Sequence, residues 1–218
     1  MRLFVGLLFI GFFSFFTAPE FTDWGGYNGG DNRNHFSPLT QINVSNVKNL
    51  KLAWSYSSGG ADTVNQTTQI QCNPIIIQGV LYGVSAGSQA FALDAKSGRE
   101  IWKTAIQEKT PSMNSRGVAF YSSPGQRSKI FFGYGSYLFA LDAKTGKPVE
   151  NFGQHGKINL LDGIRRPGSD DYTVLNTPIS IYKNTLIVGT RVSESAPALL
   201  GDIRAFDATS GRLIWTFH

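Results

Sequence analysis

An eleven-residue phrase occurs three times in this chain, and this repetition constrains the fold more than any other feature. The copies begin at Ala92, Ala140 and Ala205 and share the pattern Ala-x-Asp-Ala-x-[Ser/Thr]-Gly-[Lys/Arg]. The centre of the pattern suits a tight turn, because Asp can bond backbone amides ahead of it and Gly can take positive φ. Alternating runs that contain Trp102 and Trp215 follow two of the turns. One such unit cannot bury its apolar face alone, so the repeats predict stacked β units.

Each phrase is preceded by further β-rich runs, at 73–83, 116–133 and 177–189. Every unit therefore has four short runs separated by Gly, Pro, Asn or Asp. The turn residues Asp94 and Asp142 lie 48 residues apart, which is about one four-stranded propeller blade. The sequence thus predicts an all-β fold, a partial β-propeller of about three four-stranded blades. The longer interval before the third copy predicts an inserted loop at 151–174, and the best helix candidate, 45–51, is only about two turns long.

Composition agrees with a globular β protein and excludes some partners. Apolar residues make up 41% of the 218 residues, and only 16% are charged. The net charge of +5 is scattered without a Lys/Arg run, so we expect no nucleic-acid partner. Cys72 is the only cysteine, which excludes an internal disulfide, and its strand-like neighbours predict an unpaired buried thiol.

The N-terminus is typical of an export signal. Arg2 precedes an apolar run from Leu3 to Phe16, followed by Thr17-Ala18-Pro19. We interpret residues 1–18 as a signal peptide or a short N-terminal anchor, and 19–218 as the propeller portion. The run is short for a membrane span, whereas Phe16 stands where a cleavage site usually has a small residue, so both alternatives stay open. The expected location is periplasmic or exported, with anchoring to the inner membrane as the alternative.

The phrase followed by Trp resembles the tryptophan-docking repeat of quinoproteins that bind pyrroloquinoline quinone (PQQ). The opening Asp23-Trp-Gly-Gly-Tyr-Asn-Gly-Gly-Asp31 and the segments 36–43, 50–56, 71–74 and 115–118 are similar to the start of sugar and alcohol dehydrogenases of this type. Together they most resemble the membrane-associated glucose dehydrogenase branch, from Asp23 to His218. The resemblance implies a ring of about eight blades, of which this chain is an N-terminal portion. It also implies that 50–56 is an outer strand that closes the ring.

The cofactor's chemistry indicates which residues to expect near it. PQQ is a flat ortho-quinone with three carboxylates, so its site needs cationic or multi-donor groups, and Ca²⁺ or Mg²⁺ to polarise the quinone carbonyl. Arg116 opens an expected inner strand and matches by position the arginine that contacts PQQ carboxylates in the family. The alternative is an ordinary surface arginine at a strand end.

The resemblance implies further site residues. Glu194 matches a calcium-ligating glutamate of alcohol-oxidising relatives, and a carboxylate suits a hard cation, although the glucose branch differs here and a plain loop carboxylate is the alternative. Gln71 stands where relatives have a glutamate. Three polar residues at expected inner-strand ends complete the predicted cofactor-binding set: Asn176, Thr177 and Thr190. Thr110-Pro111 replaces the vicinal cysteines of the alcohol branch, which argues against that branch.

The implied function is PQQ-dependent oxidation of an aldose such as glucose, or of a related alcohol, with electrons passed to a quinone or another acceptor. No catalytic residue is assigned, because the family's catalytic base is expected beyond residue 218. Two alternatives stay open: a non-catalytic scaffold propeller with the same repeats, and an inactive truncated fragment.

Overall fold

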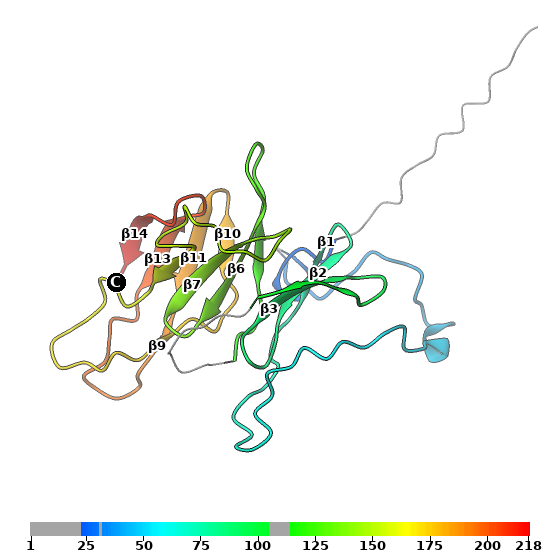
Figure 1. The fold of residues 1–218 in the computed structure, drawn as a ribbon, viewed down its shortest axis with the longest axis horizontal. Coiled ribbons are helices and arrows are strands. Elements are labelled where there is room, and N and C mark those ends of the chain that lie inside the picture. The colour runs from blue at the N-terminus through cyan, green and yellow to red at the C-terminus, as the bar shows by residue number, and fades with distance from the viewer. Residues whose placement is uncertain (1–22, 31, 105–113) are drawn as a thin grey trace, which may run out of the picture.

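Three four-stranded antiparallel sheets follow one another along the chain (Figure 1). The structure is a computed structural model that describes residues 23–30, 32–104 and 114–218. The first sheet contains β1 (Ile75–Ile77), β2 (Val80–Val84), β3 (Ala90–Asp94) and β4 (Glu100–Lys103). The second contains β5 (Ala119–Tyr121), β6 (Lys129–Tyr134), β7 (Tyr137–Asp142) and β8 (Lys157–Asn159). The third contains β10 (Ser180–Tyr182), β11 (Thr185–Gly189), β13 (Ile203–Asp207) and β14 (Leu213–Phe217).

The prediction of an all-β fold with three four-stranded units is confirmed. A two-stranded ribbon is added, in which β9 (Thr173–Val174), before the third sheet in sequence, pairs with β12 (Arg191–Val192), between β11 and β13. The described residues contain no α-helix, and the helix candidate at 45–51 contains only the 3₁₀ helix η2 (Val47–Asn49). A second 3₁₀ helix, η1 (Tyr27–Gly29), lies nearer the N-terminus. In this part of the chain no helix has the length and apolar character needed to cross a membrane. The expected signal or anchor at 1–18 lies outside the described residues.

The predicted insertion at 151–174 is only partly correct, because β8 lies inside it. In the second copy of the phrase Pro148 follows the turn and contributes only a single bridge to Leu141, since proline has no N–H to donate to a ladder. Phe152, between Pro148 and the start of β8, is completely buried. The additional lengths of chain are 160–174 and 190–202, and each contains one ribbon strand.

The core lies between the sheets rather than within any one of them. Ile130 and Phe132 of β6 pack with side chains of the first sheet, whereas Phe131 packs with side chains of the third. Successive residues of a strand point to opposite faces, so the second sheet is buried on both sides. Burial on both faces explains why all six residues of β6 are buried.

The three repeated phrases form turns at one end of the sheets. Each turn bonds to the first hairpin turn of its own sheet, through Ala95 N to Gly79 O (2.9 Å), Ala143 N to Ser128 O (2.9 Å) and Ala208 N to Asn184 O (2.9 Å). We call this end the turn face and the opposite end the loop face. Strand direction alternates, so the starts of the inner strands β1, β5 and β10 all lie on the loop face, at the bottom of Figure 1.

Tryptophan docking joins neighbouring units at the turn face. Trp102 of β4 donates its indole N–H to Ala143 O (3.0 Å) and covers Gly146, where a Cβ would come within 2.5 Å of the ring. Trp54 makes the same contact one unit earlier, with Ala95 O (3.2 Å) and Gly98. Residues 50–56 form no ladder with a described strand. The partner expected for this strand is the last blade of the ring, so its pairing stays a prediction. Trp54 within it occupies the same docking position as Trp102.

The contact between the second and third sheets uses a lysine instead of an indole. The second phrase has Glu150 at the tryptophan position, and Ala208 O, the counterpart of Ala143 O, accepts a hydrogen bond from Lys129 Nζ (2.9 Å). Thr209 O accepts a second (3.2 Å), and the side chain of Lys129 is buried. Burial lowers the pKa of Lys129, and the negative charge of Asp207 acts in the opposite direction. A desolvated ammonium therefore fills the position that indole nitrogens fill in the other two contacts.

Candidate functional site

The inner strands begin side by side on the loop face. Asn73 N donates to Arg116 O (2.9 Å), and Arg116 N donates to Asn176 O (2.8 Å). Asn73 and Gly117 also form a parallel bridge. The segments that lead into β1, β5 and β10 are therefore linked by backbone bonds at one level. This arrangement brings together three chain segments that are far apart in sequence.

Arg116 projects from the middle of these three segments. Its side chain is exposed and makes no hydrogen bond or ion pair with another described residue. The following glycine permits the close approach of its neighbours, because a Cβ on Gly117 would lie 3.1 Å from Asn73 O and 3.2 Å from Pro178 Cγ. The Arg-Gly pair thus combines tight backbone contact with a guanidinium whose five donors are available to a ligand.

Three of the other predicted cofactor-binding residues lie near the segment that contains Arg116. The ladder between β10 and β11 ends at Ser180–Ile187, and pairing resumes at Val174–Arg191 in the ribbon. The predicted polar residues of the third sheet lie in the irregular stretch between these pairs: Asn176, Thr177 and Thr190. Asn176 and Thr190 are half-buried and Thr177 is exposed.

Gln71 lies on the same face, two residues before Asn73. Its side chain is exposed, and its amide nitrogen donates to Gln69 Oε1 (3.0 Å). The carbonyl oxygen of the Gln71 amide makes no such bond within the described chain, so it can accept a hydrogen bond there.

Glu194 lies apart from these donors, in the loop after β12. Its carboxylate accepts a hydrogen bond from Arg191 Nη2 (3.3 Å), and both side chains are exposed. With Asp170 and Tyr172 the pair lines a shallow pocket of about 400 Å³. Within the described ranges no group of three or more His, Cys, Asp or Glu side chains is placed to hold a metal ion. The residues present therefore do not make a divalent-cation site by themselves.

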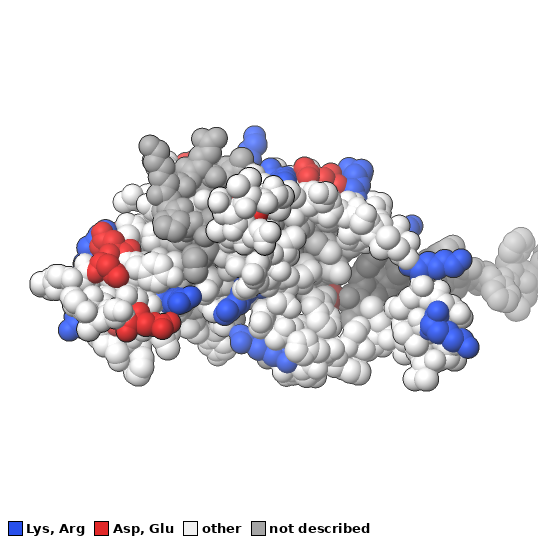
Figure 2. All heavy atoms as spheres, turned by 90° about the horizontal axis from the view of Figure 1, so that it is seen from below, with Lys and Arg blue, Asp and Glu red and all other residues white. Residues whose placement is uncertain are grey.

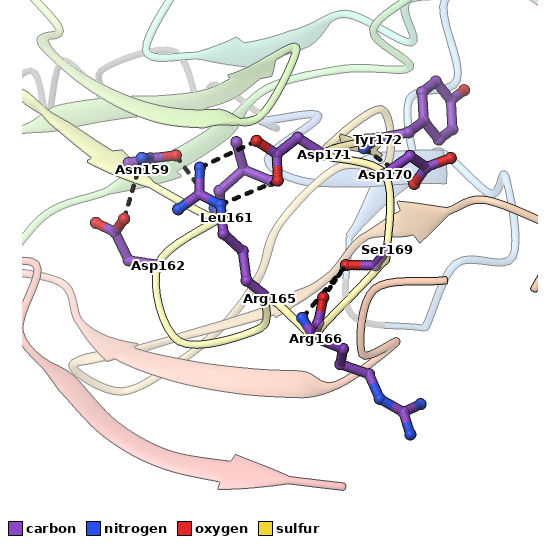
Figure 3. A network of polar contacts seen from close by, with 9 residues as sticks. All are labelled: Asn159, Leu161, Asp162, Arg165, Arg166, Ser169, Asp170, Asp171 and Tyr172. Atoms are coloured by element: carbon purple, nitrogen blue, oxygen red, sulfur yellow. Dashed lines mark hydrogen bonds and ion pairs between the residues drawn. The ribbon is translucent and has the colours of Figure 1, made fainter. Parts of the chain in front are cut away.

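The loop between β8 and β9 is held in place beside this face. Arg165 Nε donates to Asp171 Oδ1 (3.0 Å), and Asn159 Nδ2 donates to Asp162 Oδ1 (3.1 Å) (Figure 3). The buried Arg204 of β13 donates to the backbone oxygens of Leu160 (2.6 Å) and Asp162 (2.9 Å) from beneath. These contacts order the loop that leads into Asn176.

Seen from the loop face, uncharged residues dominate the surface (Figure 2). Acidic and basic side chains lie interspersed at the end where the loops of the third sheet project. No single sign of charge covers this face, so recognition of an anion must depend on individual guanidinium groups.

The donor set suits the edge of PQQ but not its expected metal. A free guanidinium with neighbouring amide and hydroxyl groups matches a planar ligand that carries carboxylates. The single carboxylate Glu194, already bonded to Arg191, does not match a cation that takes six or more oxygen ligands.

Comparison with known proteins decides the family. Residues 24–218 match the family model described as PQQ: Glucose/ethanol/alcohol dehydrogenase, beta-propeller domain. The chain belongs to this family. Membership in the PQQ propeller family agrees with the repeat, with the docking tryptophans and with the four-stranded sheets.

Two curated relatives of this PQQ propeller are dehydrogenases. The glycerol dehydrogenase large subunit of Gluconobacter oxydans is 31% identical over 219 residues, which cover 92% of this chain and 29% of the relative. The quinoprotein glucose dehydrogenase of Escherichia coli is 31% identical over 213 residues, covering 89% of this chain and 27% of the relative. The quinohemoprotein alcohol dehydrogenase of Comamonas testosteroni superposes with a TM-score of 0.72 at 27% identity, over 90% of this chain and 27% of that one. The chain therefore spans less than a third of each.

One residue of interest was not found from the sequence. Arg33 donates from Nη2 to Ser180 Oγ (3.1 Å) at the start of β10, across 147 residues of sequence. Its position in an Asn- and Gly-rich stretch indicates a loop but gives no indication of this contact. The position 110–111, expected to distinguish the alcohol branch, lies outside the described residues.

Cys72 provides a test of the packing beside the site. It forms no disulfide, and Val84 N donates to its Sγ (3.2 Å). Burial raises the pKa of its thiol from 9.0 to about 11, with the Val84 bond acting in the opposite direction. Only the thiolate is alkylated, so at pH 8 the native protein should react about 100-fold more slowly with iodoacetamide than the urea-unfolded protein. Mass spectrometry of the single cysteine measures both rates, and equal rates would contradict the half-buried position of the thiol.

Proposed function

We propose that the full-length protein is a PQQ-dependent dehydrogenase that oxidises an aldose such as glucose, or a related alcohol, and passes the electrons to a quinone or another acceptor. The observation that carries the proposal is the unpartnered guanidinium of Arg116, held where three inner strands begin, in a chain of this family. The backbone of Arg116 is hydrogen-bonded to both neighbouring segments while its side chain faces solvent, so the residue suits ligand binding better than a structural role.

Bound PQQ would supply the two-electron acceptor of the reaction. The described residues would bind and orient it. Arg116 donates charge-assisted hydrogen bonds to a carboxylate, and the amide and hydroxyl groups of Asn176 and Thr177 offer neutral donors on the same face. Gln71 and Thr190 are secondary candidates. The proton acceptor for the substrate hydroxyl is proposed to lie outside the described residues.

Polyhydroxy substrates are part of the proposal because two relatives, each 31% identical to this chain, are named for glucose and for glycerol. Both compounds carry several hydroxyl groups. A Ca²⁺ or Mg²⁺ ion belongs to the proposal only with further ligands from outside the described residues, because Glu194 is a single candidate. The apolar N-terminal run supports an exported or periplasmic location, with membrane anchoring as its alternative.

Replacing Arg116 with alanine tests this function. We expect PQQ affinity to fall about 10- to 150-fold, corresponding to the ~1.5–3 kcal/mol of a charge-assisted hydrogen bond. Equilibrium dialysis of PQQ against the full-length protein measures the change. Arg127→Ala is the matched control, because Arg127 is exposed in the turn between β5 and β6, on the opposite face.

The same measurement separates an enzyme from a scaffold propeller. A scaffold needs the repeats but no cofactor, so it would bind PQQ no more tightly than the Arg116→Ala variant does. If the wild type and both variants bind PQQ equally weakly, the dehydrogenase proposal is wrong.

A further inference from the structure

The N-terminal segment lies along the inner strands of the sheets. Its start is fixed to the first sheet, where Trp24 and Ile76 exchange two backbone hydrogen bonds (2.9 and 3.0 Å). Asp23 Oδ1 accepts a further bond from Gln78 N (2.8 Å) at the turn face. Trp24 pairs antiparallel to β1, so the segment runs from the turn face towards the loop face. It reaches the third sheet where Arg33 bonds Ser180.

Between these anchors the segment is compact. Gly29 N donates to Gly26 O (3.0 Å), Arg33 N donates to Gly30 O (3.0 Å) and His35 N donates to Asn28 O (3.1 Å). Gly29 has a φ of +104°, which favours glycine, and a Cβ there would lie 2.9 Å from the Trp24 ring. Both the backbone conformation and the lack of space therefore exclude a side chain at this position. The backbone bonds therefore fix the direction in which Arg33 leaves the segment.

A polar pocket of about 340 Å³ lies between this segment and two inner strands. Gly25, Gly26, Gly30 and Arg33 form one wall, and residues 118–120 and 179–181 form the other. A Cβ on Gly30 would meet nothing within 4 Å, so the space beside it is open. Among the described residues that line the pocket, Arg33 is the one with a charged side chain.

The charge of Arg33 is not compensated by its partner. The hydroxyl of Ser180 is neutral, and no described carboxylate pairs with the guanidinium. The bond to Ser180 uses one of five N–H donors, so four are left for a ligand. Ala119, in the opposite wall, is the first residue of β5 and follows Arg116 by three residues in the sequence. Three residues of extended chain span at most about 10 Å, so the backbone of Arg116 lies within about that distance of this wall.

We propose that Arg33 is a second cationic contact for the carboxylate-bearing ligand of Arg116. The inference rests on the proposed function, since it takes PQQ as that ligand. A molecule with three carboxylates needs more than one cation for charge compensation, and the glycine-lined pocket gives its anionic edge access to Arg33. The sequence resemblance assigns Arg33 no such role.

Two substitutions of similar length separate charge from packing. In the full-length protein, Arg33→Gln should lower PQQ affinity about tenfold or more, whereas Arg33→Lys should keep it within about threefold of the wild type. Raising the salt concentration should weaken PQQ binding less in Arg33→Gln than in the wild type, because one ionic contact is missing. Ser180→Ala removes only the anchoring hydroxyl and should cost less than Arg33→Gln. Equilibrium dialysis with PQQ itself is the assay, and each variant's thermal midpoint is recorded without PQQ.

The possible outcomes are distinct. Equal PQQ affinities for Arg33→Gln and Arg33→Lys, within twofold, would overturn the inference while Arg116→Ala still lost affinity. If Arg116→Ala also bound PQQ as the wild type does, the proposed function itself would fail. If a variant lowers the thermal midpoint, the inference rests on the difference in PQQ affinity between Arg33→Gln and Arg33→Lys. Both changes remove the guanidinium, and they differ in charge.

Discussion

Replacing Trp102 with alanine is expected to lower the free energy of unfolding by about 3–5 kcal/mol, the usual range for a buried tryptophan. Only 8% of this residue is exposed, and its ring lies against Gly146 so closely that no side chain fits there. The change would open a cavity between the first and second sheets and remove the donor of Ala143 O. Urea unfolding of the full-length protein, followed by circular dichroism, measures the loss.

Trp102→Phe is the matched control. Phenylalanine keeps an aromatic ring over Gly146 but lacks the N–H that bonds Ala143 O. We expect it to cost about 1–3 kcal/mol, the range for a buried acceptor left without its donor. A loss below about 1 kcal/mol in Trp102→Ala would mean that the docking contact does not hold the sheets together. Equal losses in the two variants would mean that the hydrogen bond matters and the ring does not.

The fold was predictable because its determinants are local and repeated. In each copy Asp94, Asp142 and Asp207 bond backbone amides within three residues, as the turn pattern requires. The repeat pattern gave a wrong strand position where a single residue of the phrase differs. Pro148 interrupts the second copy, and β8 starts later than the first copy predicts. A periodic pattern locates a strand only while every copy keeps its hydrogen-bonding residues.

The site was predictable only in part, because its contacts join distant segments. The sequence placed Arg116, Asn176 and Thr177 at strand ends, and the shared strand direction brings those ends to one face. It gave no indication that Arg33 would reach Ser180, nor that Glu194 would pair with Arg191. Such side-chain pairs depend on loop paths rather than on periodicity. The six predicted site residues have positions in the fold, while their contacts with cofactor or metal stay predictions.

Lys129→Ala is expected to cost about 3–5 kcal/mol, the second of the two largest effects. Alanine would leave Ala208 O and Thr209 O without their donor and would empty the space of the aliphatic stem. The ammonium also lies 5.5 Å from the centre of the Tyr121 ring, an attraction that would be lost. Urea unfolding of the full-length protein again measures the loss.

Lys129→Met separates the charge from the stem, since methionine has a similar length and no donor. We expect it to cost about 1–3 kcal/mol, less than alanine, because it keeps the packing but leaves two buried oxygens unbonded. A methionine variant as stable as the wild type would mean that the desolvation of the ammonium offsets its hydrogen bonds. The lysine would then be a tolerated residue at this contact, where the other two contacts have a tryptophan. The backbone hydrogen bond from Gly153 N to Ser210 O (2.8 Å) would then hold the second and third sheets together instead.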